Sequence, residues 1–222
     1  MATYKKGIDG PVMGKVGQHV GSKWKSIYYL RSLAAAVRNP RTPAQRRVRA
    51  RFAQLMKMSH SFDAAIGKGF YKSPLMQRMT PTNIFISRNW DQVTATGPDS
   101  VEVNYGMLTV AEGRLAGVAF GTVDYGETQH LTISVAMDGS TGGDGADADD
   151  NVYLFAYCPD LELGVLSAPV KRSATAVTLS LPSNWDGQTV HLYGFAEASA
   201  SNTRYPIYTC SLSAYCGSGE VQ

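Results

Sequence analysis

The first regular pattern along the chain is an apolar face at helical spacing that begins shortly after residue 42. Thr42 suits an N-cap, Pro43 suits the first helical position, and Gln45 stands where a glutamine completes a capping box. Spacings of four and three then predict one face, formed by Val48, Phe52, Leu55, Ser59, Phe62 and Ile66. Gly67 and Gly69 predict the end of this helix.

From residue 101 onward the pattern changes to short apolar runs separated by glycine or acidic residues, as in strands joined by turns. The runs lie at residues 101–105, 108–110, 118–123, 131–135, 152–157, 163–168, 176–181, 190–196 and 204–212. Roughly seven or eight strands among these nine runs, over about 110 residues, predict an immunoglobulin-like or fibronectin-like β-sandwich. The Cys…Trp…Cys pattern of antibody domains is absent, so we expect the chain to share only the sandwich architecture with immunoglobulin domains.

The segment ahead of the helix is built on glycine. Glycines recur at spacings of three and four, at Gly7, Gly10, Gly14, Gly17 and Gly21. A helix is a poor interpretation, because each glycine costs about 1 kcal/mol relative to alanine. Turns and short strands fit better, since glycine permits positive φ and close approach of backbones. The aromatic and β-branched run at residues 24–31 predicts a strand of a glycine-rich hairpin.

Together these patterns predict a mixed α+β protein that is mainly β. Residues 80–83 predict the start of a second short helix or a turn. Residues 90–100, with Gly97 and Pro98, have the composition of a domain boundary or a loop. We therefore expect a region at 1–95 with the hairpin and the amphipathic helix, followed by the sandwich at 96–222.

The charge of the chain is divided between these two parts. The 222 residues carry a net charge of +3, and their hydrophobic content of 44% is that of an ordinary globular protein. Residues 1–90 hold seventeen lysines and arginines against two acidic residues, whereas residues 91–222 hold four against sixteen. This asymmetry favours an anionic partner for the basic part, or attraction between neighbouring copies. The alternative is two regions whose surface charges differ without a function.

The basic part offers candidate contact residues on the helix and the hairpin. The helical arginines form either a solvated face or a cationic ridge for phosphates or an acidic protein surface. Candidate contacts to phosphate or to a partner are Lys23, Lys25, Arg31, Arg41, Arg46, Arg47, Arg49 and Arg51. Trp24, Tyr28 and Tyr29 are candidate assembly residues, because a two-stranded hairpin is marginal alone. The helix of the same chain or a neighbouring subunit is expected to cover them.

One loop of the acidic part has oxygen ligands of the kind that calcium prefers. Within residues 138–151, the candidate ligands are Asp144, Asp147, Asp149 and Asp150. The alternation of Asp147, Asp149 and Asn151 matches the start of an EF-hand loop, but Val152 stands where glycine is required and no glutamate closes the site. An acidic hairpin tip is the alternative interpretation.

No catalytic signature stands out in the sequence. The four histidines do not pair with the three cysteines at zinc-ligand spacing, and no G-x-S-x-G turn or phosphate-binding loop order occurs. We therefore predict a non-enzymatic protein with no cofactor and no small-molecule substrate. An apolar run of about 18 residues is also absent, so no spanning helix is predicted.

Several segments resemble a known family. These are residues 7–25 (GIDGPVMGKVGQHVGSKWK), 29–32 (YLRS), 39–45 (NPRTPAQ), 152–162 (VYLFAYCPDLE) and 190–195 (VHLYGF). They are similar to a family from Bacteroidota genomes that is catalogued as a domain of unknown function, number 6266. The resemblance spans most of the chain and implies a gut-bacterial or bacteriophage setting. It assigns no activity and no catalytic residues.

Three classes of function remain open. The first is a structural assembly protein, such as a phage virion component, that forms a homo-oligomer or larger assembly through its basic N-terminal half. The second is a sequence-tolerant nucleic-acid binder that uses Lys and Arg contacts to phosphate with aromatic stacking. The third is a carbohydrate-binding module or an enzyme. The start of the sequence has no signal-peptide pattern, so a cytoplasmic or virion location without membrane contact is expected.

Overall fold

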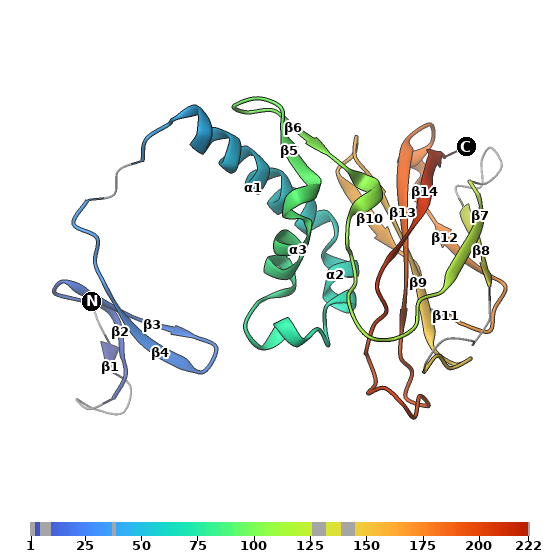
Figure 1. Cartoon of the computed structure of the whole chain (residues 1–222), viewed down its shortest axis with the longest axis horizontal. Helices are drawn as coiled ribbons and strands as arrows, with labels where there is room; N and C mark the ends of the chain where they lie inside the picture. The colour runs from blue at the N-terminus through green and yellow to red at the C-terminus, as the bar shows by residue number, and fades with distance from the viewer. Residues whose placement is uncertain (1–2, 5–9, 37–38, 126–131, 139–144, 222) are drawn as a thin grey trace. The chain divides into compact units, whose positions relative to one another are not determined.

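Strands outweigh helices in the fold, at 37% against 24% of the residues, so the predicted mixed and mainly β class is confirmed. The computed structural model describes residues 3–4, 10–36, 39–125, 132–138 and 145–221. The chain divides into two compact units, Met1–Arg41 and Thr42–Gln222 (Figure 1). We call them the N-terminal sheet and the main unit. The division follows Arg41, whereas the sequence pattern places a boundary near residue 95.

The N-terminal sheet is a four-stranded antiparallel meander in the order β1-β2-β3-β4. Its strands are β1 (Thr3–Tyr4), β2 (Val12–Val16), β3 (His19–Trp24) and β4 (Ile27–Ser32). Glycine serves two purposes here. Gly17 takes a φ of +55° in the β2–β3 turn, and a Cβ at Gly21 would collide with the carbonyl oxygen of Val12.

The predicted strand at residues 24–31 is wrong in one respect, because a turn at Lys25 and Ser26 divides it. Lys25 has a φ of +51°, which allows the chain to reverse so that Trp24 pairs with Ile27. Strand propensity is high on both sides of the turn, and the turn itself lacks the usual glycine or asparagine. The pattern of residue types therefore conceals it.

The main unit begins with three helices, two of which start where local capping rules predict. Helix α1 (Pro43–Ser61) is capped by Thr42, whose side chain accepts a hydrogen bond from the Gln45 amide. The second half of a capping box is not formed, because Gln45 Oε1 has no hydrogen-bond partner among the described residues. Helix α3 (Pro81–Asn89) is capped in the same way by Thr80.

The long helix ends earlier than the sequence pattern predicts. It stops at Ser61, and a separate helix α2 (Asp63–Gly69) follows after Phe62. Phe62 has φ −90° and ψ 1°, outside the helical region, and its ring is fully buried. The break directs Phe62 and Ile66 into the core, whereas Val48 and Phe52 nearer the start of the helix are exposed. The short 3-10 helices are η1 (Pro74–Gln77), η2 (Trp90–Gln92), η3 (Tyr105–Met107) and η4 (Ser183–Trp185).

Residues 90–100, expected to form a domain boundary or a loop, contain η2, one strand and the turn of a β-hairpin. Strands β5 (Val93–Ala95) and β6 (Val101–Val103) pair with each other, and Gly97 and Pro98 lie in the turn between them. Val93 is fully buried and the hairpin packs against α1. A glycine-proline turn inside a hairpin has the same composition as a linker, so only these contacts distinguish the two.

Two antiparallel sheets complete the main unit. The larger sheet has the order β10-β9-β13-β14, and β11 also pairs with β9. Its strands are β9 (Asn151–Cys158), β10 (Leu163–Leu166), β11 (Val170–Lys171), β13 (Thr189–Glu197) and β14 (Ala214–Glu220). The smaller sheet has the order β12-β8-β7, from β7 (Ala119–Asp124), β8 (Thr132–Asp138) and β12 (Ala176–Ser180).

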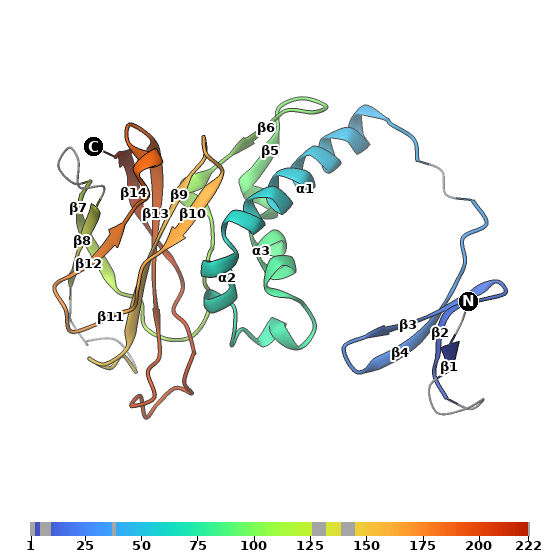
Figure 2. The same cartoon turned by 180° about the vertical axis from the view of Figure 1, so that it is seen from behind.

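The larger sheet is the middle of three layers, with the helices on one face and the smaller sheet on the other (Figures 1 and 2). Side chains of β9 alternate between the two cores. Tyr153, Phe155 and Tyr157 join the aromatic cluster under the helices, whereas Val152 and Leu154 join the cluster between the sheets. Because both faces of β9 are buried, its apolar run is continuous.

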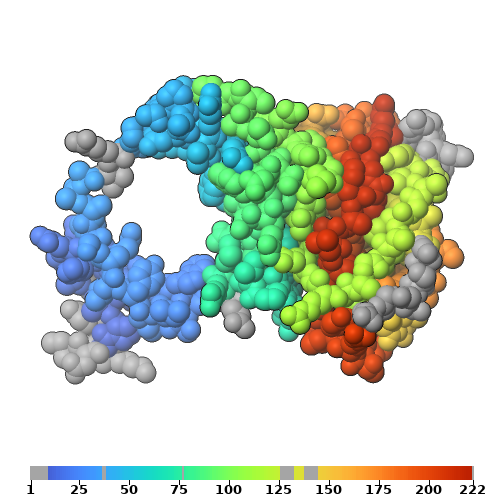
Figure 3. Space-filling view, viewed as in Figure 1, coloured from blue at the N-terminus to red at the C-terminus, as the bar shows by residue number. Residues whose placement is uncertain are grey.

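Three of the predicted strands differ from the structure. Within residues 101–105 only Val101–Val103 form a strand, β6, which pairs with β5 and belongs to neither the larger nor the smaller sheet. Residues 108–110 form no strand, although Leu108 and Val110 are buried. Residues 204–212 form only isolated bridges. The last strand is β14, which pairs with β13 and lies at the surface beside β7 (Figure 3). Its glycines at 217 and 219 hide it from a search for β-branched residues.

Candidate functional site

The N-terminal sheet has almost no interior of its own. Among its described residues, 10–36 and 39–41, only Gly21 is buried. Trp24, Tyr28 and Tyr29, the predicted assembly residues, are all exposed, at 45%, 42% and 45%. All six residues of β4 are exposed as well. An apolar surface of this kind on a small sheet is typical of an interaction site.

The register of β3 and β4 distributes these side chains over both faces of the sheet. Trp24 pairs with Ile27 and Ser22 pairs with Tyr29, so their side chains share one face. Lys23 pairs with Tyr28 on the opposite face, and its Nζ lies 5.1 Å from the centre of the Tyr28 ring. Each face therefore carries both apolar or aromatic side chains and basic side chains.

The basic residues of this sheet are not balanced by acidic ones. Residues 10–41 contain no Asp or Glu, and Lys23, Lys25, Arg31 and Arg41 are exposed. The predicted contact residues of the N-terminal part are thus placed at its surface together with the exposed aromatic rings. The structure brings these two groups of predicted residues together in one unit.

The arginines of α1 are engaged to different degrees within the main unit. Arg46 forms a salt bridge with Asp99 in the β5–β6 turn, with Nε 3.0 Å from Oδ1. Arg51 donates to the carbonyl of Trp90 at 2.5 Å and lies over its ring, 4.5 Å from the centre. Arg47 and Arg49 lie on exposed positions of the helix. Part of the predicted ridge therefore supports the hairpin next to it.

Asp150, near the end of the predicted acidic loop, is held by contacts with other parts of the main unit. Asp150 is fully buried beside Arg172, whose Nε lies 3.9 Å from Oδ2. Its carboxylate also accepts from the Asp147 amide at 2.9 Å and from the Asn202 side chain at 3.1 Å. Burial lowers the pKa of Arg172, and the Asp150 charge opposes that effect.

These contacts use the oxygen atoms that a cation would need at Asp150. Asp147 Oδ1 accepts from the Asp149 amide, while Asp144 lies outside the described residues. Within the part of the chain that the structure describes, no three His, Cys, Asp or Glu side chains are grouped to hold a metal ion.

A second polar cluster lies between α2 and β13. Tyr153 donates to Glu197 at 2.7 Å, and Lys68 Nζ lies 3.2 Å from the Tyr153 hydroxyl. Burial and the Glu197 hydrogen bond raise the pKa of Tyr153 well above its ordinary value. Burial likewise raises the pKa of the Cys210 and Cys216 thiols to about 12, so both stay protonated at neutral pH.

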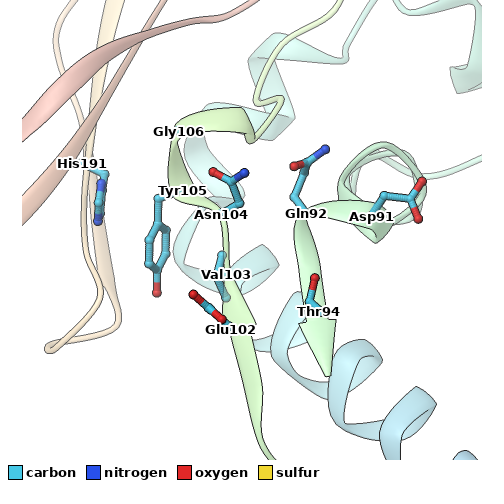
Figure 4. Close-up of a pocket in the computed structure, with 9 residues that line it drawn as sticks. All are labelled: Asp91, Gln92, Thr94, Glu102, Val103, Asn104, Tyr105, Gly106 and His191. Atoms are coloured by element: carbon cyan, nitrogen blue, oxygen red, sulfur yellow. The ribbon is translucent and has the colours of Figure 1, made fainter. Parts of the chain in front are cut away.

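A cavity in the main unit lies between the β5–β6 hairpin, η3 and β13 (Figure 4), and no sequence motif indicates it. It has a volume of about 510 Å³, and we call it the Tyr105 pocket. Its lining consists of Asp91, Gln92, Thr94, Glu102, Val103, Asn104, Tyr105, Gly106 and His191. The lining therefore has two carboxylates, two amides and no lysine or arginine.

Tyr105 and His191 form one wall of this pocket. Their rings are stacked, with centres 4.3 Å apart and planes 19° apart (Figure 4). His191 Nδ1 is hydrogen-bonded to the Tyr215 hydroxyl at 2.9 Å. Burial lowers the pKa of His191, so the imidazole is neutral at pH 7. Burial and the Asp160 charge raise the pKa of Tyr105, which keeps its hydroxyl protonated. The charge of the lining is thus negative.

The fold and these surfaces define a class: a mixed α+β protein with a three-layered main unit, an acidic pocket and a basic sheet. The chain matches the family of unknown function DUF6266 over residues 11–210 and belongs to that family, as its sequence motifs indicate. No curated protein and no solved structure matches the chain. Within the described residues, no helix is both long and apolar enough to span a membrane.

Proposed function

We propose that this chain is a non-enzymatic assembly protein whose N-terminal sheet docks onto an acidic surface of another copy. One observation carries the proposal: the sheet exposes apolar and basic side chains on both faces, with only Gly21 buried among its described residues. A virion, in which many copies of one chain are joined by repeated contacts, is an assembly of the proposed kind.

The apolar surface of the sheet is stabilised when a partner covers it. Trp24, Ile27 and Tyr29 belong to one face and are each about half exposed or more. Full burial of a large apolar side chain contributes roughly 1.5–3 kcal/mol. Covering this face with a partner therefore offers several kcal/mol, which the isolated sheet does not obtain.

The charge of the chain supports a second copy as the partner. Residues 1–41 have eight basic residues and one acidic residue, whereas residues 91–222 have sixteen acidic and four basic residues. Attraction between a basic sheet and an acidic main unit joins different surfaces of two copies. Such heterologous contacts extend into rings or filaments and do not close as a two-fold dimer.

We also propose that the two sheets of the main unit form an immunoglobulin-like or fibronectin-like sandwich. The order of the strands supports this. In chain order, β7, β8 and β12 are in one sheet, and β9, β10, β13 and β14 are in the other. Constant-type immunoglobulin domains divide as A, B, E, D against C, F, G, so the present order differs in its fourth strand, β10. Domains of this architecture commonly present surfaces to partners.

Light scattering coupled to size-exclusion chromatography tests the assembly proposal. At about 50 mM salt we expect a mass above that of one chain, which decreases toward the monomer as salt screens the charges. Trp24→Ser with Tyr29→Ser is expected to abolish association. Leu212→Ser, at an exposed apolar position of the main unit, is the matched control and is expected to associate normally. A monomer at high concentration and low salt would contradict the proposal.

A nucleic-acid partner is the second candidate function. The observation in its favour is the mixture of exposed aromatic rings and basic residues on β3 and β4. Here log K against log[salt] is expected to decrease by about 0.7–0.9 for each phosphate contact. Replacing Lys23, Lys25 and Arg31 by alanine would flatten that slope by up to about three contacts. No binding at about 50 mM salt would exclude this function.

A further inference from the structure

We propose that the Tyr105 pocket is the acceptor for the β3–β4 turn of a second copy, whose Lys23 and Lys25 side chains enter it as ammonium groups. This inference rests on the proposed assembly function and names the two surfaces that meet. It concerns a cavity in the main unit and a turn in the N-terminal sheet.

The lining of the pocket favours a cation over other ligands. Asp91 and Glu102 supply negative charge, and Gln92 and Asn104 supply amide oxygens. His191 is neutral, so no positive group in the lining repels an ammonium ion. An anionic ligand would face two carboxylates and would find no lysine or arginine in the lining to balance its charge. The negative face of the Tyr105 ring also attracts a cation that lies beside this aromatic wall.

Glu102 is the carboxylate of the pocket that has no salt bridge within the described residues. The salt bridges of the main unit use Asp91, Asp99, Glu112, Asp150 and Glu162. Asp91 is held only distantly, with 3.8 Å between its Oδ1 and Arg51 Nη2. Glu102 is exposed on β6 opposite Thr94, where its side chain lines the cavity (Figure 4). An incoming lysine would supply the missing charge.

The β3–β4 turn has the chemistry and the size that this cavity accepts. Lys23 and Lys25 flank Trp24, which is exposed, and the reversal of the chain at Lys25 makes the turn the end of a hairpin. The cavity of about 510 Å³ lies within the roughly 300–1,000 Å³ typical of ligand pockets. It accommodates side chains from a narrow turn rather than a whole strand.

Two other cavities of the main unit carry no comparable argument. The cavity beside Tyr71 and Tyr208 is lined by Glu197 but also by Lys68, which already supplies a positive charge next to that carboxylate. The cavity beside Val48 is lined by Arg49 and has no acidic residue in its lining. Of these three cavities, only the Tyr105 pocket has both a carboxylate without a salt bridge to a described residue and a lining without lysine or arginine.

Charge reversal on the full chain tests the inference in two variants. The pocket variant is Glu102→Lys, and the turn variant is Lys23→Glu with Lys25→Glu. Each is expected to weaken self-association at about 50 mM salt at least tenfold, because attraction becomes repulsion. Asp186→Lys makes the same kind of charge change at an exposed site outside the pocket and is expected to associate like the unmodified chain. Circular dichroism checks that every variant is folded.

Mixing the two variants separates contact between copies from contact within one chain. In the mixture, the lysine introduced by Glu102→Lys meets the glutamates introduced into the turn of the other variant, so association is expected to return. Failure of the mixture to associate would overturn the inference. Glu102→Gln keeps the shape of the pocket and is expected to weaken association less than Glu102→Lys; it serves if the reversal disturbs folding.

The outcomes distinguish this inference from the proposed function. If the unmodified chain associates and Glu102→Lys associates equally well, the pocket is not the acceptor, while assembly through the N-terminal sheet stands. If the unmodified chain is monomeric under all conditions, the proposed function fails and the inference fails with it.

Discussion

Replacing Phe62 by alanine is expected to destabilise the entire main unit. Phe62 is fully buried at the junction of α1 and α2. Its ring centre lies 4.7 Å from those of both Phe155 and Tyr157, and 5.2 Å from that of Phe85. These partners come from β9 and α3, so one side chain joins the helical layer to the larger sheet.

The size of the expected loss in unfolding free energy follows from these contacts. Phenylalanine-to-alanine substitutions in protein cores cost about 3–5 kcal/mol, and aromatic pairs add about 0.5–1.5 kcal/mol each beyond area burial. We therefore expect a loss near the upper end, about 5 kcal/mol. For a unit of this size, 1 kcal/mol shifts the melting temperature by roughly 2–4 °C, so a decrease of roughly 10–20 °C is expected.

The assay is thermal unfolding followed by far-UV and near-UV circular dichroism, with urea unfolding to obtain the free energy. Because helices and sheet share one aromatic core, both signals are expected to shift together in one transition. Val48→Ala, at an exposed position on the same helix, is the control and is expected to change stability by less than about 0.5 kcal/mol. Two transitions, of which only the helical one moves, would refute a shared core.

Three further predictions address other parts of the molecule. Arg172→Met leaves Asp150 buried without its cation, so a loss of about 3–5 kcal/mol in urea unfolding is expected, and a smaller loss when Asp150→Asn is added. Burial lowers the pKa of His191, so protonation of its imidazole opposes folding. The free energy of unfolding is therefore expected to be retained above about pH 6.5 and to decrease as the pH falls below that value. His191→Gln is expected to reduce this decrease, measured in denaturation curves at about pH 5–7. Deleting residues 1–41 is expected to leave the melting temperature of the remainder unchanged at high salt, because both hydrophobic clusters lie after residue 42.

Local rules predicted the helix starts and the strands with clear apolar runs. Thr42 and Thr80 each precede a proline, and the hydroxyl that caps the helix needs no distant partner. The strand at residues 152–157 was predicted from its apolar run, and β9 covers it. Each of these features depends on residues within a few positions along the chain.

Features that depend on distant contacts were missed or misplaced. Gly97 and Pro98 signal a turn, but only the packing of Val93 against α1 shows that the strand before that turn belongs to the core. The counter-charges of Arg46 and Arg51 come from other elements, so the sequence of α1 alone shows only unbalanced arginines. Tyr105 and His191 meet only because η3 lies beside β13. No spacing along the chain could indicate the pocket.

The burial of both faces of the larger sheet has a consequence for hydrogen exchange. Backbone amides of β9 and β13 are flanked by strands on either side and covered by the helices and by the smaller sheet. Water reaches them only when a whole layer has separated, which exposes a hydrophobic cluster. Their exchange therefore reports the free energy of global opening, whereas amides of the exposed β4 edge exchange through local fluctuations. Strands β9 and β13 are therefore expected to be the last part of the molecule to lose protection from hydrogen exchange.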